Sequence, residues 1–196
     1  MALNKTVDFW RAWIRAPRRV GAVAPSGRAL TRLMVAAVDH RHGPVIELGP
    51  GTGVFTRALV ASGLPPHRLA LVEVDPILAR ALRRDYPGAR VVRMDAARLG
   101  DTGPLFGTEL AGAVVSGLPL RSLPAKTVAR LIEGVFERQL DPRGAFFQFT
   151  YGPGCPLPGA LLERLGLEAT RIGSALFNLP PATVYRINRA GCDELR

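Results

Sequence analysis

Cysteine and histidine are scarce in this sequence, which has two cysteines and three histidines among 196 residues. Cys155 and Cys192 belong to no C-x-x-C pair, so they fit free thiols better than a disulfide framework or a zinc site. His40 and His42 lie together in a polar stretch that favours a solvated loop. We therefore expect no bound metal and a reducing, cytoplasmic environment.

Long hydrophobic runs are also missing. No apolar run approaches the ~20 residues of a membrane span, and the N-terminus does not follow the signal-peptide pattern. The sequence shows no internal repeat and no low-complexity segment. At 47% hydrophobic and 21% charged residues it has an ordinary globular composition, and its length suits one domain better than two.

Acidic residues are the third shortage. Sixteen Asp and Glu stand against 26 Lys and Arg, which gives a formal net charge of +10 and a pI of about 11.1. Such a protein is attracted to polyanions, either nucleic acid or an anionic membrane. Residues 1–20 contain five basic residues and one acidic residue, a net charge of +4.

The first residues predict an amphipathic helix over 3–16. Apolar residues recur at three- and four-residue steps, and we assign to the membrane-facing side Phe9, Trp10, Trp13 and Ile14. The basic residues of the segment are Lys5, Arg11, Arg15, Arg18 and Arg19. Tryptophan beside a basic face is typical of an interfacial membrane anchor. The alternative is a first helix that packs its aromatic side on the domain, and a combination of the two is also open.

A glycine-rich corner at residues 47–53 reads E-x-G-x-G-x-G, directly after the apolar pair Val45-Ile46 and before a predicted helix over 54–62. A dinucleotide fingerprint would need glycine where Val54 stands. Glu47 would repel a pyrophosphate but suits a cationic ligand, which favours S-adenosylmethionine. The alternative is a turn that binds nothing. The candidate cofactor residues here are Glu47, Gly49, Gly51, Thr52 and Gly53.

Carboxylates follow the next two predicted strands. Glu73, at the end of a strand over 68–73, is placed to accept hydrogen bonds from ribose hydroxyls, with Val74 beside it. Asp75 stands before Pro76 and favours a cap for a helix over 77–85. Asp95 is placed to accept from an adenine amino group, or is only a capping residue. Further candidate cofactor residues are Met94, Ala96, Ser116 and Ser26, the last of which can also cap a helix over about 28–39.

Strand and helix patterns alternate from residue 45 to residue 150. We expect later strands over 89–94, 111–115 and 145–150, a helix over about 125–140 and a short helix over 161–165. Two runs, 167–177 and 182–189, suggest an antiparallel hairpin at the sheet edge. The pattern predicts an α/β fold with a doubly wound, mostly parallel sheet and a site at the carboxyl ends of its strands.

The motifs ELGPGTG, LVEVDP, RMDA and VSGLPL, in this order, resemble those of the class I S-adenosylmethionine-dependent methyltransferases. With FWRAWIRAPRRVGAVAPSGRAL and NLPPATVYRI, nearly the whole chain resembles the small bacterial phospholipid N-methyltransferases. This resemblance implies a seven-stranded Rossmann-like domain over 21–196 after a membrane-binding segment over 1–20. It also implies stepwise methylation of phosphatidylethanolamine towards phosphatidylcholine, at the inner face of the cell membrane.

An rRNA adenine dimethyltransferase is the alternative enzyme. That family places Asn-(Ile/Leu)-Pro-(Tyr/Phe) after strand four, where the aromatic residue stacks on a flipped base. Here Ser116-Gly117-Leu118-Pro119-Leu120 keeps the proline and lacks both asparagine and aromatic, so nucleic acid is a less favoured partner. A third alternative is a non-catalytic basic protein that coats membrane or RNA. Such a protein would have no need for Glu47, the glycines, Glu73 and Asp95 at the successive positions of a cofactor site.

The acceptor amine needs a site beside the cofactor. Tyr151, at the end of strand five, is our candidate for orienting the amine, although a core or loop tyrosine is as compatible with the sequence. Leu118 and Pro119 can form an apolar wall that accepts partly methylated amines. A lipid ammonium is mostly protonated at neutral pH, so transfer also needs a proton acceptor or a water path.

Overall fold

The computed structural model describes residues 25–151, 154–175 and 181–191. In this part of the chain seven strands form one sheet in the order β3-β2-β1-β4-β5-β7-β6, and β7 is antiparallel to both of its neighbours. The doubly wound, mostly parallel, seven-stranded sheet is therefore confirmed. The strands are β1 (Val45–Leu48), β2 (Leu69–Glu73), β3 (Arg90–Arg93), β4 (Ala111–Ser116), β5 (Leu140–Tyr151), β6 (Leu167–Ala175) and β7 (Ala182–Arg189).

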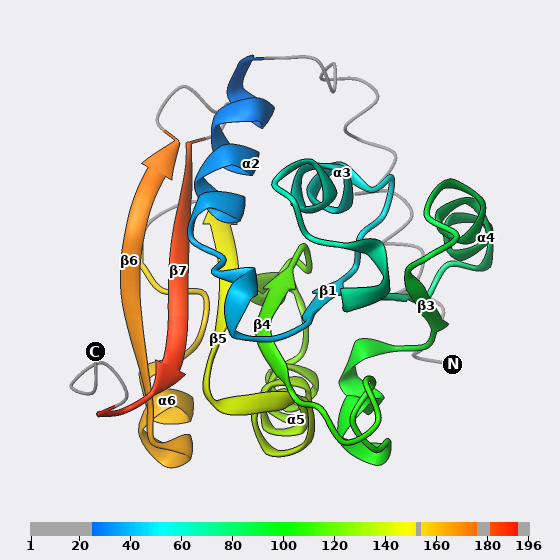
Figure 1. Cartoon of the computed structure of the whole chain (residues 1–196). Coiled ribbons are helices and arrows are strands. Elements are labelled where there is room, and N and C mark those ends of the chain that lie inside the picture. Colours follow the sequence, from blue (N-terminus) through cyan, green and yellow to red (C-terminus); the bar gives the residue numbers. More distant parts are fainter. Residues whose placement is uncertain (1–24, 152–153, 176–180, 192–196) are drawn as a thin grey trace.

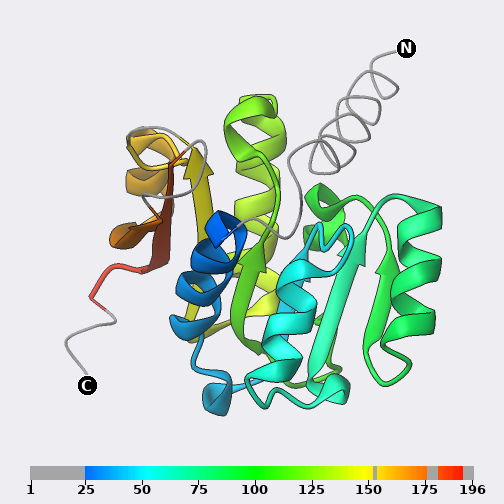
Figure 2. The ribbon, with the colours of Figure 1, turned by 90° about the horizontal axis from the view of Figure 1, so that it is seen from above.

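Helices cover both faces of the sheet (Figure 1). On one face lie α2 (Pro25–Ala36), α3 (Val54–Ala61) and α4 (Pro76–Asp85). On the other lie α5 (Ala125–Gly134), α6 (Gly159–Leu165) and the 3-10 helix η4 (Ala96–Asp101), and Figure 2 shows the same separation from above. Two apolar clusters result, one around Ile46 and Phe146 under α5, and one around Met34 under α2 and α3.

Local sequence explains where the helices begin. Asp75 caps α4, because its Oδ1 accepts from the amides of Ile77 and Leu78 at 2.8 and 3.1 Å, and Pro76 occupies the first helical position. Gly53 precedes α3 with a φ of 76°, a left-handed conformation that favours glycine. Both helix starts agree with the prediction, and both lie at the carboxyl edge of the sheet.

Two predicted boundaries are wrong. The helix predicted over 28–39 is α2, which already includes Ser26, so Ser26 lies in the first turn and does not precede the helix as a cap. Asp39 instead caps the short 3-10 helix η2 (His40–His42) by accepting from the amide of Arg41. Local side-chain hydrogen bonding of this kind competes with helix continuation.

Strand β5 begins earlier than the predicted 145–150. The break expected at residues 141–144 falls within β5, where the pairing with β4 shifts register between Ala111 and Ala113. A bulge of this type accommodates Pro142, which has no amide hydrogen for the ladder. The helix predicted over 125–140 is α5 followed by a π-helical turn, η6 (Val135–Gln139).

The predicted N-terminal helix over 3–16 and the boundary at residue 20 lie outside the described residues, and both stay predictions. So do the membrane-facing assignments made for residues 9–19. None of the helices in the described part of the chain is long and apolar enough to cross a membrane.

Candidate functional site

The carboxyl ends of β1, β2 and β4 meet around the glycine-rich corner. Gly49, Gly51 and Gly53 all have positive φ, at 65°, 58° and 76°. The amide of Gly49 donates to the carbonyl of Val72 at 2.9 Å, which ties the corner to β2. Glycines allow these angles and leave the backbone uncovered, so a ligand can approach the main chain.

Glu47 lies on β1 directly beneath this corner and is completely buried. Its Oε2 accepts a 2.6 Å hydrogen bond from the hydroxyl of Thr56 on α3. Its Oε1 is buried without a hydrogen-bond partner among the described residues. Burial raises the pKa of Glu47 to about 7, although the Thr56 bond opposes the shift. An unpartnered buried carboxylate oxygen of this kind fits a cationic ligand.

Glu73 ends β2 and is 2% exposed. Its two oxygens accept from the amides of Gly51 and Asp75, at 3.0 and 2.9 Å. Burial raises its pKa, although these bonds oppose the rise. The carboxylate thus fixes the glycine corner to the end of β2, at the place where the sequence predicts ribose recognition.

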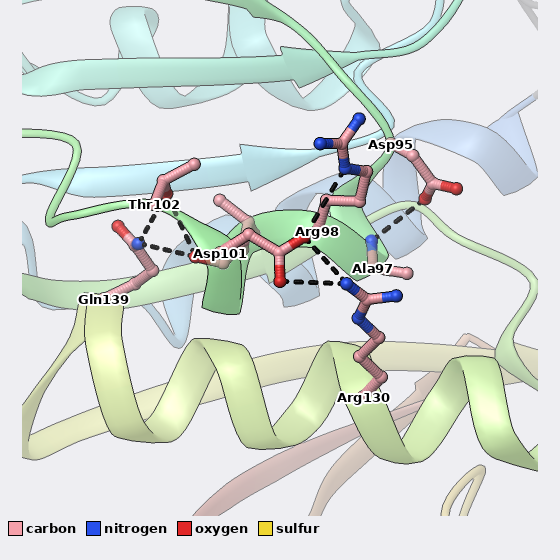
Figure 3. Close-up of polar contacts among 8 residues, drawn as sticks. Asp95, Ala97, Arg98, Asp101, Thr102, Arg130 and Gln139 are labelled. Carbon is pink, nitrogen blue, oxygen red and sulfur yellow. Dashed lines mark hydrogen bonds and ion pairs between the residues drawn. The ribbon is translucent and has the colours of Figure 1, made fainter.

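Asp95 lies at the end of β3 and is exposed. Its Oδ1 accepts from the amide of Ala97 at 3.0 Å, so it caps η4 (Figure 3). Val74 is exposed, Met94 is partly buried and Ala96 is buried. The capping role and an adenine contact remain compatible, because Asp95 is an exposed strand-end carboxylate with a second oxygen.

Helix η4 is held to α5 by a polar network that lies below this edge. Figure 3 shows the guanidinium of Arg130 reaching Asp101, at 2.7 and 2.9 Å, while Arg98 approaches the same carboxylate. The hydrogen bond from Arg130 lowers the pKa of Asp101. Buried Gln139 donates to Thr102 and accepts from the amide of Leu105. We assign this network a structural role, the docking of η4 on α5.

The segment after β4 forms the other side of the site. Ser116 is buried, and its hydroxyl accepts from the amide of Leu118 at 3.3 Å. Gly117 approaches the glycine corner so closely that an added Cβ would lie 2.9 Å from the carbonyl oxygen of Gly49. Position 117 therefore needs glycine because the neighbouring loop leaves no room for a side chain, and not because of its backbone angles.

Gln148 is a site-region residue that the sequence analysis missed. It is 1% exposed on β5, and its Nε2 donates to the carbonyl of Leu118 at 2.9 Å. Its Oε1 has no partner within the described residues. A glutamine inside the apolar run Phe146-Phe147-Gln148-Phe149 was the available signal, because a buried amide must find hydrogen bonds. Thr56, the hydrogen-bond partner of Glu47, was also missed.

A small cavity of about 130 Å³ brings together the predicted substrate residues Leu118 and Pro119 and the predicted amine-orienting residue Tyr151. Tyr151 is 40% exposed and meets Phe149 edge to face, with ring centroids 5.4 Å apart. Phe149 in turn packs against Phe55, with ring centroids 5.8 Å apart. Three rings thus connect the start of α3, beside the glycine corner, to this cavity. We refer to it as the amine cavity.

Comparison with known proteins identifies the family. No protein-family model matches the sequence. The chain is 34% identical over 170 residues to the ornithine lipid N-methyltransferase of Singulisphaera acidiphila, covering 85% of this chain and 86% of that protein. The chain belongs to the class I S-adenosylmethionine-dependent methyltransferases.

Other relatives of this methyltransferase act on RNA. This chain is 44% identical over 149 residues to the ribosomal RNA small subunit methyltransferase A of Maridesulfovibrio salexigens. That alignment covers 72% of this chain but only about half, 52%, of the relative. Among solved structures, the 1,6-didemethyltoxoflavin-N1-methyltransferase of Burkholderia thailandensis, which contains S-adenosylhomocysteine, has a TM-score of 0.66 at 14% identity. That match covers 96% of this chain and 90% of the other, and it confirms the fold.

The methyltransferase uses S-adenosylmethionine as cofactor, and the described residues fit it. A buried carboxylate with an unpartnered oxygen, three left-handed glycines and a second strand-end carboxylate gather at one edge of the sheet. No group of His, Cys, Asp or Glu that could hold a metal occurs in the described part of the chain. Thr52 is exposed on the same corner. The side chain of Ser26 lies outside the described part of the structure, so its assignment to the cofactor site stays a prediction.

Proposed function

We propose that this enzyme methylates the headgroup amine of a membrane lipid, and that phosphatidylethanolamine is its substrate, converted stepwise towards phosphatidylcholine. The observation that carries the proposal is the similarity to a lipid N-methyltransferase along most of both chains. The match to the rRNA methyltransferase covers only about half of that protein's length. Because that relative is named for an ornithine lipid, an ornithine headgroup amine is the second candidate.

The amine cavity supports a small aliphatic amine better than a nucleobase. The segment after β4 contributes Leu118, Pro119 and Leu120 to its wall and no aromatic residue, while the aromatic residues of the cavity, Phe149 and Tyr151, come from β5. Base-modifying enzymes hold a flipped base by stacking and by hydrogen bonds to its edge. A wall of leucine and proline suits methyl groups, which accumulate on the amine as the reaction repeats.

Cofactor recognition is assigned to the carboxylates. We propose that Glu47 faces the positive charge of the methionine part, that Glu73 accepts from the ribose, and that Val74, Met94, Asp95 and Ala96 surround the adenine. Gly49, Gly51, Thr52, Gly53 and Ser116 provide the backbone surface between these groups. Bound S-adenosylmethionine supplies a methyl group that is already activated by its sulfonium.

The protein therefore contributes position, desolvation and proton removal. The apolar wall at Leu118 and Pro119 excludes water from the amine. We assign to the hydroxyl of Tyr151 the orientation of that amine, because the side chain lines the cavity and is partly exposed. The ammonium loses its proton to water at the open side before its lone pair becomes available.

Membrane association completes the proposal. The segment 1–20 would hold the enzyme on the inner face of the cell membrane, with Trp10 and Trp13 in the interface and the arginines among anionic headgroups. This placement would deliver lipid amines to an enzyme that presents no membrane-spanning helix in its described part.

The deciding experiment incubates the purified enzyme with labelled S-adenosylmethionine and one of three acceptors: phosphatidylethanolamine vesicles, ornithine lipid vesicles, or ribosomal RNA. We expect label in phosphatidylethanolamine, as mono-, di- and trimethyl forms. Label in ornithine lipid alone would move the proposal to the second candidate. Label in adenine of rRNA, with none in lipid, would contradict both.

A further inference from the structure

A second and larger cavity adjoins the amine cavity. It has a volume of about 680 Å³, within the ~300–1,000 Å³ range typical of ligand pockets. It runs between the start of α5 and the start of α6, two helices on the same face of the sheet (Figures 1 and 2). The segment Cys155–Pro158 forms its third side. We name it the α5–α6 groove.

The two cavities adjoin each other. Leu120, Arg121 and Pro156 line both of them, so the groove begins where the amine cavity ends. Apart from Arg121 and Arg164, the residues that line the groove are apolar. Arg164 forms a 2.7 Å ion pair with Glu133. Because Arg121 lines both cavities, its positive charge stands at the junction between the small cavity and the apolar groove.

This order matches the order of groups along an amine lipid. Such a lipid carries first an amine, then an anionic phosphate or carboxylate, and then an acyl chain. Resting on the proposed function, we infer that the α5–α6 groove binds one acyl chain of the lipid whose amine occupies the amine cavity, with Arg121 beside the anionic group. The enzyme then recognises the chain of its substrate as well as the headgroup.

Chain recognition can be separated from membrane binding with short-chain lipids. Dihexanoyl, diheptanoyl and dioctanoyl phosphatidylethanolamine are used below their critical micelle concentrations, so that no interface is present. Ornithine lipids of matching chain length form a second arm, which distinguishes phosphate from carboxylate at Arg121. Each added methylene group that is buried should lower KM by about fourfold.

Two variants obstruct the groove. Ala160→Trp places a large ring at an exposed groove position on α6, and Ala129→Trp places one at a partly buried groove position on α5. We expect both to remove the dependence of KM on chain length while S-adenosylmethionine affinity is retained. The matched control is Ala61→Trp, at the exposed end of α3, far from the carboxyl edge of the sheet. It should keep the wild-type dependence on chain length.

The outcomes separate this inference from the proposed function. If wild-type enzyme methylates no lipid of either arm, the proposed function fails. If lipids are methylated with a KM that does not depend on chain length, another occupant such as a segment of this chain fills the groove, and the inference is overturned. It is also overturned if the Trp variants lose as much activity on the dihexanoyl as on the dioctanoyl lipid, because the groove would then only support the amine cavity.

Discussion

The acid–base chemistry of Glu47 depends strongly on its surroundings. It is buried, its pKa is raised to about 7, and one of its oxygens lacks a partner in the described structure. Its neighbour Glu73 adds to the rise, because two carboxylates near each other disfavour ionisation. A cation that binds beside Glu47 would stabilise the charged form, so binding should be linked to proton release.

Cofactor affinity should therefore rise with pH. Below pH 7 Glu47 is mostly protonated in the free enzyme, so the dissociation constant of S-adenosylmethionine should fall as pH increases, by about tenfold per unit well below pH 7 and by less as pH 7 is approached. Above the raised pKa the dependence should level off. Titration calorimetry in two buffers of different ionisation enthalpy measures both the affinity and the proton released.

The control for this linkage is Glu47→Gln, which keeps the shape of the side chain and cannot ionise. Its affinity should be lower and independent of pH over the same range. A pH dependence that survives in Glu47→Gln would assign the titration to another group.

Glu73 should also contribute to cofactor binding. Its replacement should lower the affinity without abolishing the pH dependence that we assign to Glu47. Because the carboxylate is assigned to the ribose hydroxyls, Glu73→Ala should weaken S-adenosylmethionine binding by about 1–3 kcal/mol. The exposed carboxylate of Glu109, which pairs with Arg68, provides a control, and Glu109→Ala should bind normally. Wild-type affinity in Glu73→Ala, measured by calorimetry, would remove the assignment.

At the scale of elements, the contact between two loops determines the shape of the site. The loop after β1 and the loop after β4 approach at Gly49 and Gly117, and the amide of Gly117 donates to the carbonyl of Leu48 at 2.8 Å. Gln148 supports the second loop from β5. The two loops thus belong to one packed unit that joins the glycine corner to the wall of the amine cavity at Leu118.

Gly117→Ala tests this contact. The added methyl group would lie 2.9 Å from the carbonyl oxygen of Gly49, so the loops must move apart. We expect weaker cofactor binding and a lower kcat, with the circular dichroism spectrum of the sheet retained. Gly27→Ala is the matched control, since nothing lies within 4 Å of a Cβ there and alanine favours helix α2. Equal effects of the two substitutions would contradict the role of the contact.

Comparison of sequence and structure shows which elements the sequence could predict. The strand–glycine–helix corner and the Asp75-Pro76 cap were predictable because their determinants are local in sequence. The pairing of Glu47 with Thr56, and of Gln148 with the carbonyl of Leu118, was not, because it depends on which faces of β1, α3 and β5 meet. The α5–α6 groove joins residues of the segment 120–129 to residues of the segment 155–164, so it leaves no local pattern in the sequence.

At the scale of the whole molecule, charge is the dominant feature, with a net +10. The segment 1–20 should bind anionic vesicles and release them as salt rises, because each basic residue near such a surface contributes about 1 kcal/mol and is screened. Replacing Arg11, Arg15, Arg18 and Arg19 with Ala should strongly reduce vesicle flotation and change S-adenosylmethionine affinity little. Trp10 and Trp13, the only tryptophans, report insertion by a fluorescence shift.

A control with the same loss of charge distinguishes location from total charge. In this control variant, Ala replaces four exposed arginines of the described domain, namely Arg57, Arg80, Arg90 and Arg143. This variant should float with anionic vesicles almost as the wild type does. If both variants float alike and the tryptophan fluorescence stays unshifted, the first helix packs on the domain and the charge serves another purpose.

The insertion of β7 between β5 and β6 has a consequence for synthesis of the chain. β6 is made before β7, yet its only strand partner in the described sheet is β7, through eight paired positions. On the ribosome, β6 therefore has to wait for residues 182–189 to emerge, and until then the outer edge of β5 is an open template for other strands. Strands β1 to β4 with α3 and α4 can assemble earlier, whereas α2 and α6 also pack against the last two strands. Expression yield should thus depend on what protects that edge until β7 has been synthesised.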